Sequence, residues 1–398
     1  MPGAAPGAVQ EVVPAAGEEA LGIEAVSGTE LRLRLVRPCP SLPAILALAS
    51  LCPVQRACVE RWGSRWIAPE HLVSNGPFRL VERRVRDRLR LARSDGYWGR
   101  GEVALGTIDA WAMDGGTTQV NLFLTGGADW MVRPPSGLYG ALLGRPDCVR
   151  GPQSGLTFLR YNHTRAPFSD ARVRLALLLA LDRESLARDV MRGGETAADS
   201  FVPRGMPGYD PPRWPGQDVQ RARALLAAAG FPGGAGFPDV ELLHPHMQVA
   251  RDLCEALAAQ WRARLGLRCR LVNQPWKVFL DSQSQLRYDV SWSAWIADWL
   301  APETFLELFQ SGGGNNRCGF ADTGYDALLA AAAASADGAG RAALLARAEQ
   351  RLVDACALAP LHQRANVNLV SPRVTGFHDN LLDVHPLRDL GLAPGGAP

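Results

Sequence analysis

The chain has 398 residues, which is more than one ordinary globular core holds, so at least two lobes are expected. Hydrophobic residues make up 47% and charged residues 21%, which is typical of a folded chain and excludes wholesale disorder. The 42 basic and 40 acidic side chains leave a net charge of +2. A charge this small excludes a broad cationic surface, so we expect neither nucleic acid nor an anionic membrane as a main partner.

The first part of the chain shows no signal for membrane insertion or secretion. Residues 1–22 contain no Lys or Arg and no continuous apolar stretch, and we expect them to form a disordered tail rather than a signal peptide. The longest apolar run, residues 42–54, includes two prolines and is shorter than the ~20 residues that span a bilayer. As written, the chain is expected in the cytoplasm, unless its true start lies upstream.

Cysteine and histidine spacing gives little support to a metal site. The eight cysteines include no CxxC pair, and in a chain of this length we expect small buried hydrophobic residues rather than disulfides. His244 and His246 form an HxH pair, but Pro245 lies between them, and no further ligand follows at a zinc-like spacing. We therefore expect no metal and no cofactor.

Strand patterns come first in chain order. Residues 30–36 alternate, with leucines on one face and arginines on the other, as in a half-buried strand. Residues 78–85 and 88–93 form two more strand patterns joined around Arg86 and Asp87. This arrangement predicts a hairpin.

Helical patterns with polar starts follow. Residues 172–181 carry apolar side chains at helical spacing, with Ser169 or Asp170 available as N-cap. Residues 219–229 form another helix pattern, with Asp218 as N-cap and a glycine just past the end. The sequence therefore predicts two capped helices in this part of the chain.

The second half of the chain alternates helices and strands. The clearest apolar stripe starts at residue 249 and closes at Gly266, and strand patterns follow at 267–271 and 288–295. A short helix is expected near Pro302, before three further predicted elements: helices over 325–334 and 341–358, and a strand over 366–370. Alternation of this kind predicts an α/β architecture with parallel or mixed sheets whose faces are covered.

Motifs of enzymes are missing from the sequence. It contains no nucleophile elbow, phosphate loop, dinucleotide fingerprint or HExxH motif. A catalytic triad escapes detection by spacing, because its members meet only in the folded chain. A hidden hydrolase would rest only on scattered His and Ser residues, so we expect a protein that is not an enzyme.

The distinctive group in the sequence is aromatic and surrounds Asp298. Four tryptophans lie close to it in the chain: Trp276, Trp292, Trp295 and Trp299. On a strand, Trp292 and Trp295 would face opposite ways, so at least one could line a cleft. A carboxylate among indoles loses hydration, which is unfavourable unless a cation pairs with it.

Two interpretations of this group stay open at the level of the pattern. In the first, a ligand ammonium group pairs with Asp298, and the indole faces add cation–π attraction. In the second, Asp298 caps the helix that starts near Pro302, and the tryptophans are core residues.

Several stretches of the sequence resemble the family 5 extracellular solute-binding proteins, the oligopeptide- and dipeptide-binding proteins of ABC transporters. Each matching motif is short, and as an ordered set they cover roughly residues 20–393. The matching stretches are 74–78 (Ser-Asn-Gly-Pro-Phe), the pair Tyr97-Trp98, 162–183, 224–231, 295–302 and 359–361.

The resemblance implies a two-lobed fold of the periplasmic-binding-protein type with mixed sheets. It implies that the N-terminal part of the first lobe and most of the accessory domain are missing. The implied division is a remnant of the accessory domain over 23–70, lobe I over 71–160 and 366–398, and lobe II over 161–365.

The resemblance also implies where a ligand would bind. In the family, the aspartate at the position of Asp298 pairs with the terminal ammonium group of the peptide, and tryptophans matching Trp276 and Trp295 line the cleft. Members specific for oligopeptides carry carboxylate-binding arginines, whose positions here correspond to Gln283 and Trp292. The complete predicted ligand-binding set is Asp298, Trp295, Trp276, Trp292, Gln283, Ile296 and His362.

The function implied by the resemblance is that of the substrate-binding component of a peptide ABC importer. Such a protein is a periplasmic or extracytoplasmic monomer that binds a short peptide or related cationic small ligand in an interlobe cleft. It would work with the permease subunits in the membrane. The alternative is a truncated remnant or interaction protein without a transport ligand, because one wall of the cleft is expected to be missing.

Overall fold

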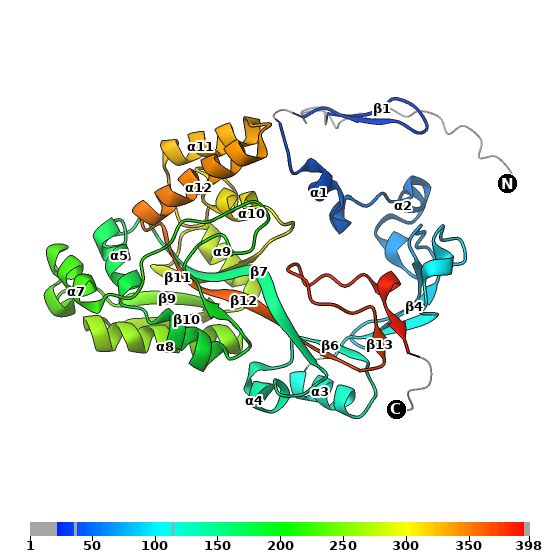
Figure 1. Ribbon diagram of the computed structural model, residues 1–398, viewed down its shortest axis with the longest axis horizontal. Helices are drawn as coiled ribbons and strands as arrows, with labels where there is room; N and C mark the ends of the chain where they lie inside the picture. Colours follow the sequence, from blue (N-terminus) through cyan, green and yellow to red (C-terminus); the bar gives the residue numbers. More distant parts are fainter. Residues whose placement is uncertain (1–21, 36–37, 114, 394–398) are drawn as a thin grey trace.

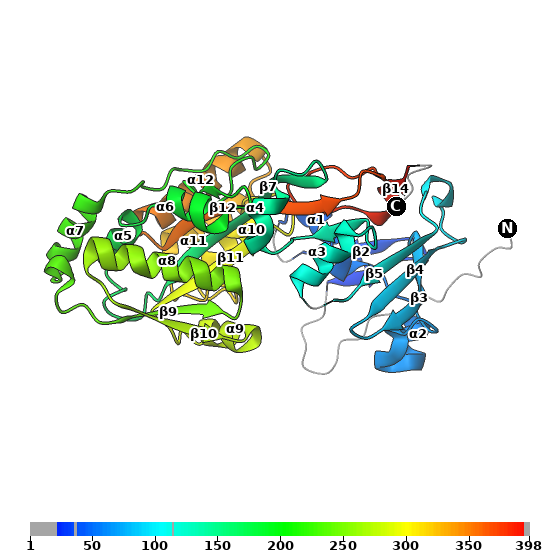
Figure 2. The same ribbon diagram turned by 90° about the horizontal axis from the view of Figure 1, so that it is seen from below.

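The computed structural model describes residues 22–35, 38–113 and 115–393. They form a two-lobed molecule, with the larger lobe at one end and a smaller lobe at the other (Figures 1 and 2). Except for Gly22, the predicted disordered tail lies outside the described residues, as does the end of the strand predicted over 30–36. Within the described residues, no helix is long and apolar enough to cross a membrane.

A mixed seven-stranded sheet forms the centre of the larger lobe and extends toward the smaller one. Its order is β10-β9-β11-β7-β12-β6, with β8 paired to β12. β9 runs parallel to β10 and β11, whereas β7 is antiparallel to both β11 and β12. The strands are β6 (Trp130–Val132), β7 (Cys148–Tyr161), β8 (Thr196–Ala197), β9 (Val240–Pro245), β10 (Cys269–Gln274), β11 (Val290–Ile296) and β12 (Leu358–Val370).

β7 and β12 are long neighbouring strands that both lobes share. They have 14 and 13 residues, and Figure 2 shows them running from the larger lobe toward the smaller one. Their pairing shifts register between Pro360 and His362 and again between Gln363 and Ala365. The ladder is therefore irregular near its middle, where the pairing is weakened and the strands can bend.

Helices cover the sheet of the larger lobe, and several begin and end where the sequence predicts. Asp170 caps α5 (Ala171–Leu179) and Asp218 caps α7 (Val219–Ala228), each through its side chain. The predicted long helix is α8 (Gln248–Leu265), which ends at Gly266 with a φ of 72°. Its Trp261 is fully buried, and the indole Nε1 donates to Leu177 O at 2.9 Å.

Two sequence predictions in this lobe are wrong in their boundaries. The helix predicted over 341–358 is α12 (Gly338–Asp354), which packs against α11 (Thr323–Ala334). Arg174 donates to the carbonyl oxygens of Ala355 and Cys356, which satisfies the end of the helix, and β12 starts only two residues later. The last strand is therefore much longer than the predicted 366–370.

The smaller lobe contains the predicted hairpin. β3 (Phe78–Arg84) and β4 (Arg88–Arg93) pair around Arg86, and β5 (Thr107–Trp111) adds a third strand. The other elements here are α3 (Gly116–Leu124), α4 (Tyr139–Leu142), β13 (Val374–Thr375) and β14 (Gly391–Leu392). The remaining short helices of the larger lobe are α6 (Arg183–Ser185), α9 (Trp276–Ser284) and α10 (Glu303–Leu306).

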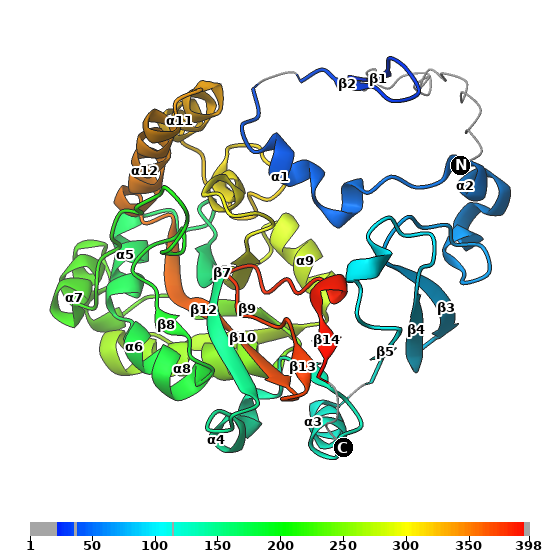
Figure 3. The ribbon, with the colours of Figure 1, turned by 45° about the vertical axis from the view of Figure 1, so that its right-hand side comes forward.

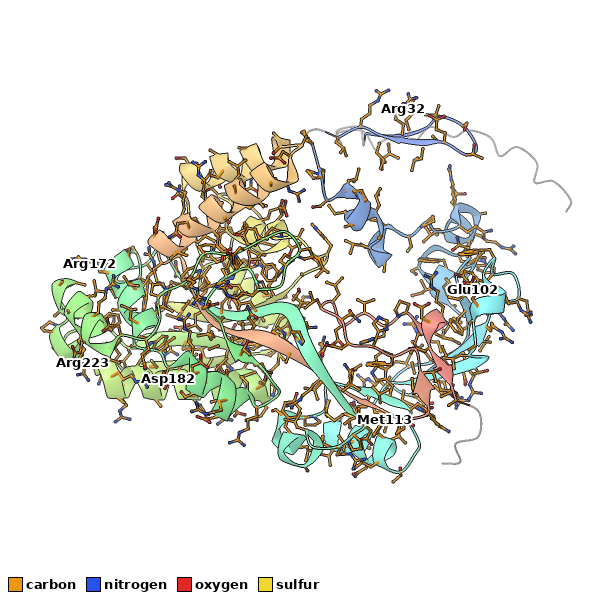
Figure 4. The ribbon with its side chains drawn as sticks, in the orientation of Figure 1. Arg32, Glu102, Met113, Arg172, Asp182 and Arg223 are labelled. Carbon is orange, nitrogen blue, oxygen red and sulfur yellow. The ribbon has the colours of Figure 1, made fainter. Side chains whose placement is uncertain are left out.

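An N-terminal segment, the described residues from 22 to 70, arches from the side of α11 and α12 to the smaller lobe (Figure 3). It consists of β1 (Ile23–Ala25), β2 (Leu31–Leu33), α1 (Leu42–Leu46) and α2 (Arg56–Trp62). Arg32 lies on this segment, far from Arg172 and Arg223 at the opposite end (Figure 4). A strand does form within the predicted 30–36, but it is short, and Leu31 is 63% exposed, so the expected half-burial is wrong.

Candidate functional site

Asp298 lies at the end of β11, in the turn that leads to α10. The preceding Ala297 donates its N–H to Ser154 O at 2.8 Å, which ties this end of β11 to β7. Ile296 pairs with Gly155 in the same ladder. The carboxylate is therefore held beside the long strands that both lobes share.

The carboxylate of Asp298 is exposed, and no described residue forms a hydrogen bond or ion pair with it. The helix-cap interpretation is wrong, because α10 begins after Pro302 and has no side-chain cap. The expectation that neighbouring indoles strip water from Asp298 is also wrong in this structure, since the residue lies in a surface turn. An exposed and unpaired carboxylate is free to accept a cationic partner.

The tryptophans near Asp298 divide between core and surface. Trp292 and Trp295 alternate along β11, as predicted, and Trp292 is only 6% exposed. Trp292 packs at 6.4 Å from Phe279, whose other neighbour is Trp276 at 5.6 Å. Trp276 is 54% exposed at the outer end of this row. Trp276 can therefore meet a ligand, whereas Trp292 is a core residue and the expectation that it lines a pocket does not match the structure.

Two indole donors flank Asp298 in the sequence. The Nε1 atoms of Trp295 and Trp299 are enclosed, and neither has a hydrogen-bond acceptor among the described residues. Buried polar groups usually have a partner. Because both atoms are enclosed, neither N–H group can reach a bound molecule in this conformation.

Gln283 and His362 are enclosed by the protein, unlike the ligand contacts that the sequence predicts. The Gln283 amide nitrogen donates to Ser291 Oγ at 2.8 Å, Ser293 Oγ at 3.0 Å and Trp292 O at 3.1 Å, which fixes α9 on β11. His362 is fully buried in β12, and burial lowers its pKa to about 3, so the imidazole is neutral at pH 7. Neither side chain reaches the exposed surface at Asp298.

Sequence reasoning missed Arg364, which lies on the Ile296 side of this site. Its Cδ is 2.8 Å from the point that a Cβ on Gly155 would occupy, and Ile296 Cγ1 is 3.2 Å from the same point. Only a glycine leaves room for the arginine stem here. A glycine inside an otherwise buried strand was the one signal in the sequence, and it becomes visible only once β7 is recognised as a strand.

Two hollows in the smaller lobe contain none of the predicted ligand-binding residues. One lies between Tyr97 and Arg388, and the other lies between Trp111 and Leu122. Asp298, Trp295 and Trp299 instead lie together in the chain at the end of β11. We therefore take the end of β11 as the candidate site.

Two lobes joined by long shared strands define the class of two-lobed binding proteins. The model of the bacterial extracellular solute-binding proteins, family 5, matches residues 3–317 of the chain. The chain belongs to this family.

Curated relatives of the chain include peptide-binding proteins. The periplasmic oligopeptide-binding protein OppA of Salmonella typhimurium is 32% identical over 366 residues, which are 90% of this chain and 67% of OppA. The periplasmic murein peptide-binding protein MppA of Escherichia coli is 31% identical over 369 residues, 90% of this chain and 68% of MppA. The chain thus spans about two thirds of these relatives.

Solved structures agree with the fold. The Escherichia coli murein tripeptide binding protein MppA has a TM-score of 0.82 and 30% identity, covering 94% of this chain and 75% of that one. The Haemophilus influenzae OppA complex with the peptide RPPGFSPFR has a TM-score of 0.79 and 27% identity, covering 93% and 75%. The two-lobed α/β fold with mixed sheets, predicted from the sequence, is confirmed.

Proposed function

We propose that this protein is the substrate-binding component of a peptide ABC importer and that Asp298 binds the terminal ammonium group of the peptide. One observation carries the proposal: the Asp298 carboxylate is exposed at the end of β11, with no partner among the described residues. The membership of the chain in family 5, and the peptides named for its relatives, support a peptide as the ligand.

The surroundings of Asp298 suit a peptide amino terminus. An ammonium group pairs with a carboxylate and is attracted by an indole face, and Trp276 exposes its indole at the start of α9, the helix that precedes β11 in the chain. A ligand that closes over Asp298 would exclude water, which strengthens the ion pair.

Closure of the lobes would occur about β7 and β12, where the register shifts loosen the ladder. Bending of shared strands is an established way for two lobes to close around a ligand. The proposal involves no catalysis. It places the protein outside the cytoplasm with the permease subunits of an importer as partners, in line with the periplasmic relatives.

Titration calorimetry with trialanine tests the proposal. Replacing Asp298→Asn keeps the shape and removes the charge, and losing one partner of a desolvated ion pair costs at least about 2 kcal/mol, or roughly thirtyfold in affinity. Asp210→Asn is the matched control, because Asp210 is 95% exposed in a distant loop of the same lobe. Equal affinity of Asp298→Asn and the unaltered protein would refute the anchor.

The second candidate function is that of an interaction protein or remnant without a transport ligand. One observation favours it: the N-terminal segment exposes apolar side chains such as Leu31 and Leu35, which a protein partner would cover. No heat of binding from the unaltered protein with di-, tri- and tetrapeptides would support this candidate over the first.

A further inference from the structure

Arg364 is a cation that the protein leaves largely without partners. It lies in the irregular part of β12, and its Nε donates to Gln153 Oε1 at the long distance of 3.3 Å. No described residue accepts a hydrogen bond from its two terminal nitrogens. The side chain is half-buried, so it has lost part of its hydration without gaining a counter-ion in contact.

The charged groups around Arg364 do not neutralise its positive charge. Burial lowers the pKa of Arg364, and the positive charge of the nearby Arg133 lowers it further. Glu195 is the carboxylate that opposes this effect, but it accepts from the Gly193 N–H at 2.7 Å, and burial raises its pKa. Burial raises the pKa of the neighbouring Tyr139 to about 12, so it is uncharged at pH 7. Arg133 has an ion pair of its own, with Asp383 at 3.9 Å. Arg364 is therefore the cation of this group that no carboxylate of the described residues contacts.

The position of Arg364 relative to Asp298 limits which ligand group could neutralise the charge of the arginine. The Arg364 stem crosses Gly155 beside Ile296, and Asp298 follows Ile296 by two residues. Two residues of chain span at most roughly 7 Å. A ligand that places an ammonium group on Asp298 would therefore need only two or three residues to bring a carboxylate within reach of Arg364.

We infer that Arg364 forms a subsite for a carboxylate of the ligand, which makes the preferred substrate a short zwitterionic peptide. This inference rests on the proposed function and adds a second charged contact to the Asp298 anchor. Planar guanidinium groups bind carboxylates through paired hydrogen bonds, and the free terminal nitrogens of Arg364 can supply them.

The competing explanation is that Arg364 only supports the irregular pairing of β7 and β12. In that case its removal would weaken binding of every peptide equally. A carboxylate subsite instead affects only peptides that carry the carboxylate. The two explanations therefore differ in how the protein ranks a peptide acid against the corresponding amide.

The experiment compares trialanine with trialanine amide by calorimetry on the full chain. Both carry the ammonium group, so both test Asp298, but only the first offers a terminal carboxylate. We expect the unaltered protein to bind the acid at least about tenfold more tightly than the amide. This measurement needs no variant and so does not depend on the folding of one.

Variants then locate the effect. Arg364→Gln should bind acid and amide with equal affinity, and Arg364→Lys should keep part of the preference because it keeps the charge. Arg251→Gln is the matched control: Arg251 is exposed on α8 and pairs with Glu255 at 2.8 Å, so the preference should be unchanged. Circular dichroism confirms that each variant is folded.

The outcomes separate this inference from the proposed function. Equal binding of acid and amide by the unaltered protein would overturn the carboxylate subsite and leave the Asp298 anchor standing. A preference for the acid that Arg364→Gln retains in full would also overturn it. Absence of binding of both peptides would overturn the proposed function and this inference together.

Discussion

The larger lobe and the N-terminal segment contain similar apolar side chains but bury them to very different degrees. The largest fully buried side chains, such as Phe158, Trp261 and Tyr325, all lie in the larger lobe. In the N-terminal segment, Leu31 and Leu35 are 63% and 48% exposed. An alternating or helical pattern thus creates an apolar face, and burial of that face depends on a second layer that packs against it.

The two regions differ in burial because they differ in the number of layers of secondary structure that pack together. In the larger lobe, helices cover both the mixed sheet and one another, and the core is continuous from β7 to α12. The N-terminal segment has a two-stranded ladder and helices of 5 and 7 residues, too short to bury much on their own. The following predictions test whether stability follows this division.

The largest expected effect is in the core of the larger lobe. Trp261→Ala should lower the free energy of unfolding by about 3–5 kcal/mol, because it removes a fully buried indole and its hydrogen bond to Leu177 O. Urea denaturation followed by circular dichroism measures it. A loss below about 1 kcal/mol would show that this core does not dominate stability.

A buried carboxylate of the larger lobe gives the next effect. Glu349 is fully buried and accepts from Tyr209 Oη at 2.7 Å and from the N–H groups of Phe201 and Val202 at 2.8 and 3.1 Å. Burial nevertheless raises its pKa to about 7. Because the folded pKa exceeds the unfolded one, the folded chain holds the proton more tightly, and stability falls as pH rises from about 4.5 to about 7.

Glu349→Gln should remove this contribution. As the pH rises across that range, the unaltered protein should lose up to about 3 kcal/mol of unfolding free energy relative to the variant. Denaturation at several pH values, with both proteins in the same buffers, measures it. A difference independent of pH would contradict the role of Glu349.

The smallest expected effect is in the N-terminal segment. Leu31→Ala should change the free energy of unfolding by less than about 0.5 kcal/mol, since the side chain is mostly exposed. Urea denaturation beside Trp261→Ala gives the comparison directly. A loss comparable to that of Trp261→Ala would mean that Leu31 is covered in solution by further protein, and the division between the two regions would fail.

Local signals were enough to predict several elements of the fold. Asp170 and Asp218 cap helices as expected, Gly266 ends α8, and the pair Arg86-Asp87 marks the hairpin. In each case the deciding interaction joins residues close in the chain, or depends on a φ value that glycine adopts most easily. The alternation of helices with strands then gave the α/β class.

β7 and β9 were missed for a physical reason. β7 is buried on both faces from Gln153 to Tyr161, so its residues do not alternate between polar and apolar. β9 is buried along most of its length in the same way. Such strands are recognised by their neighbours in the sheet, and those neighbours lie far away in the sequence.

The features of the candidate site also divide into those that the sequence determines and those that only the tertiary structure determines. The sequence by itself determined that a carboxylate and several tryptophans lie close together in the chain after residue 275, since their positions can be read directly from it. Only the tertiary structure decided that Asp298 is exposed, that Gln283, Trp292 and His362 are enclosed, and that Arg364 crosses Gly155. Whether a side chain reaches a ligand depends on the layers packed around it, and those layers are set by pairing between strands as far apart as β7 and β12.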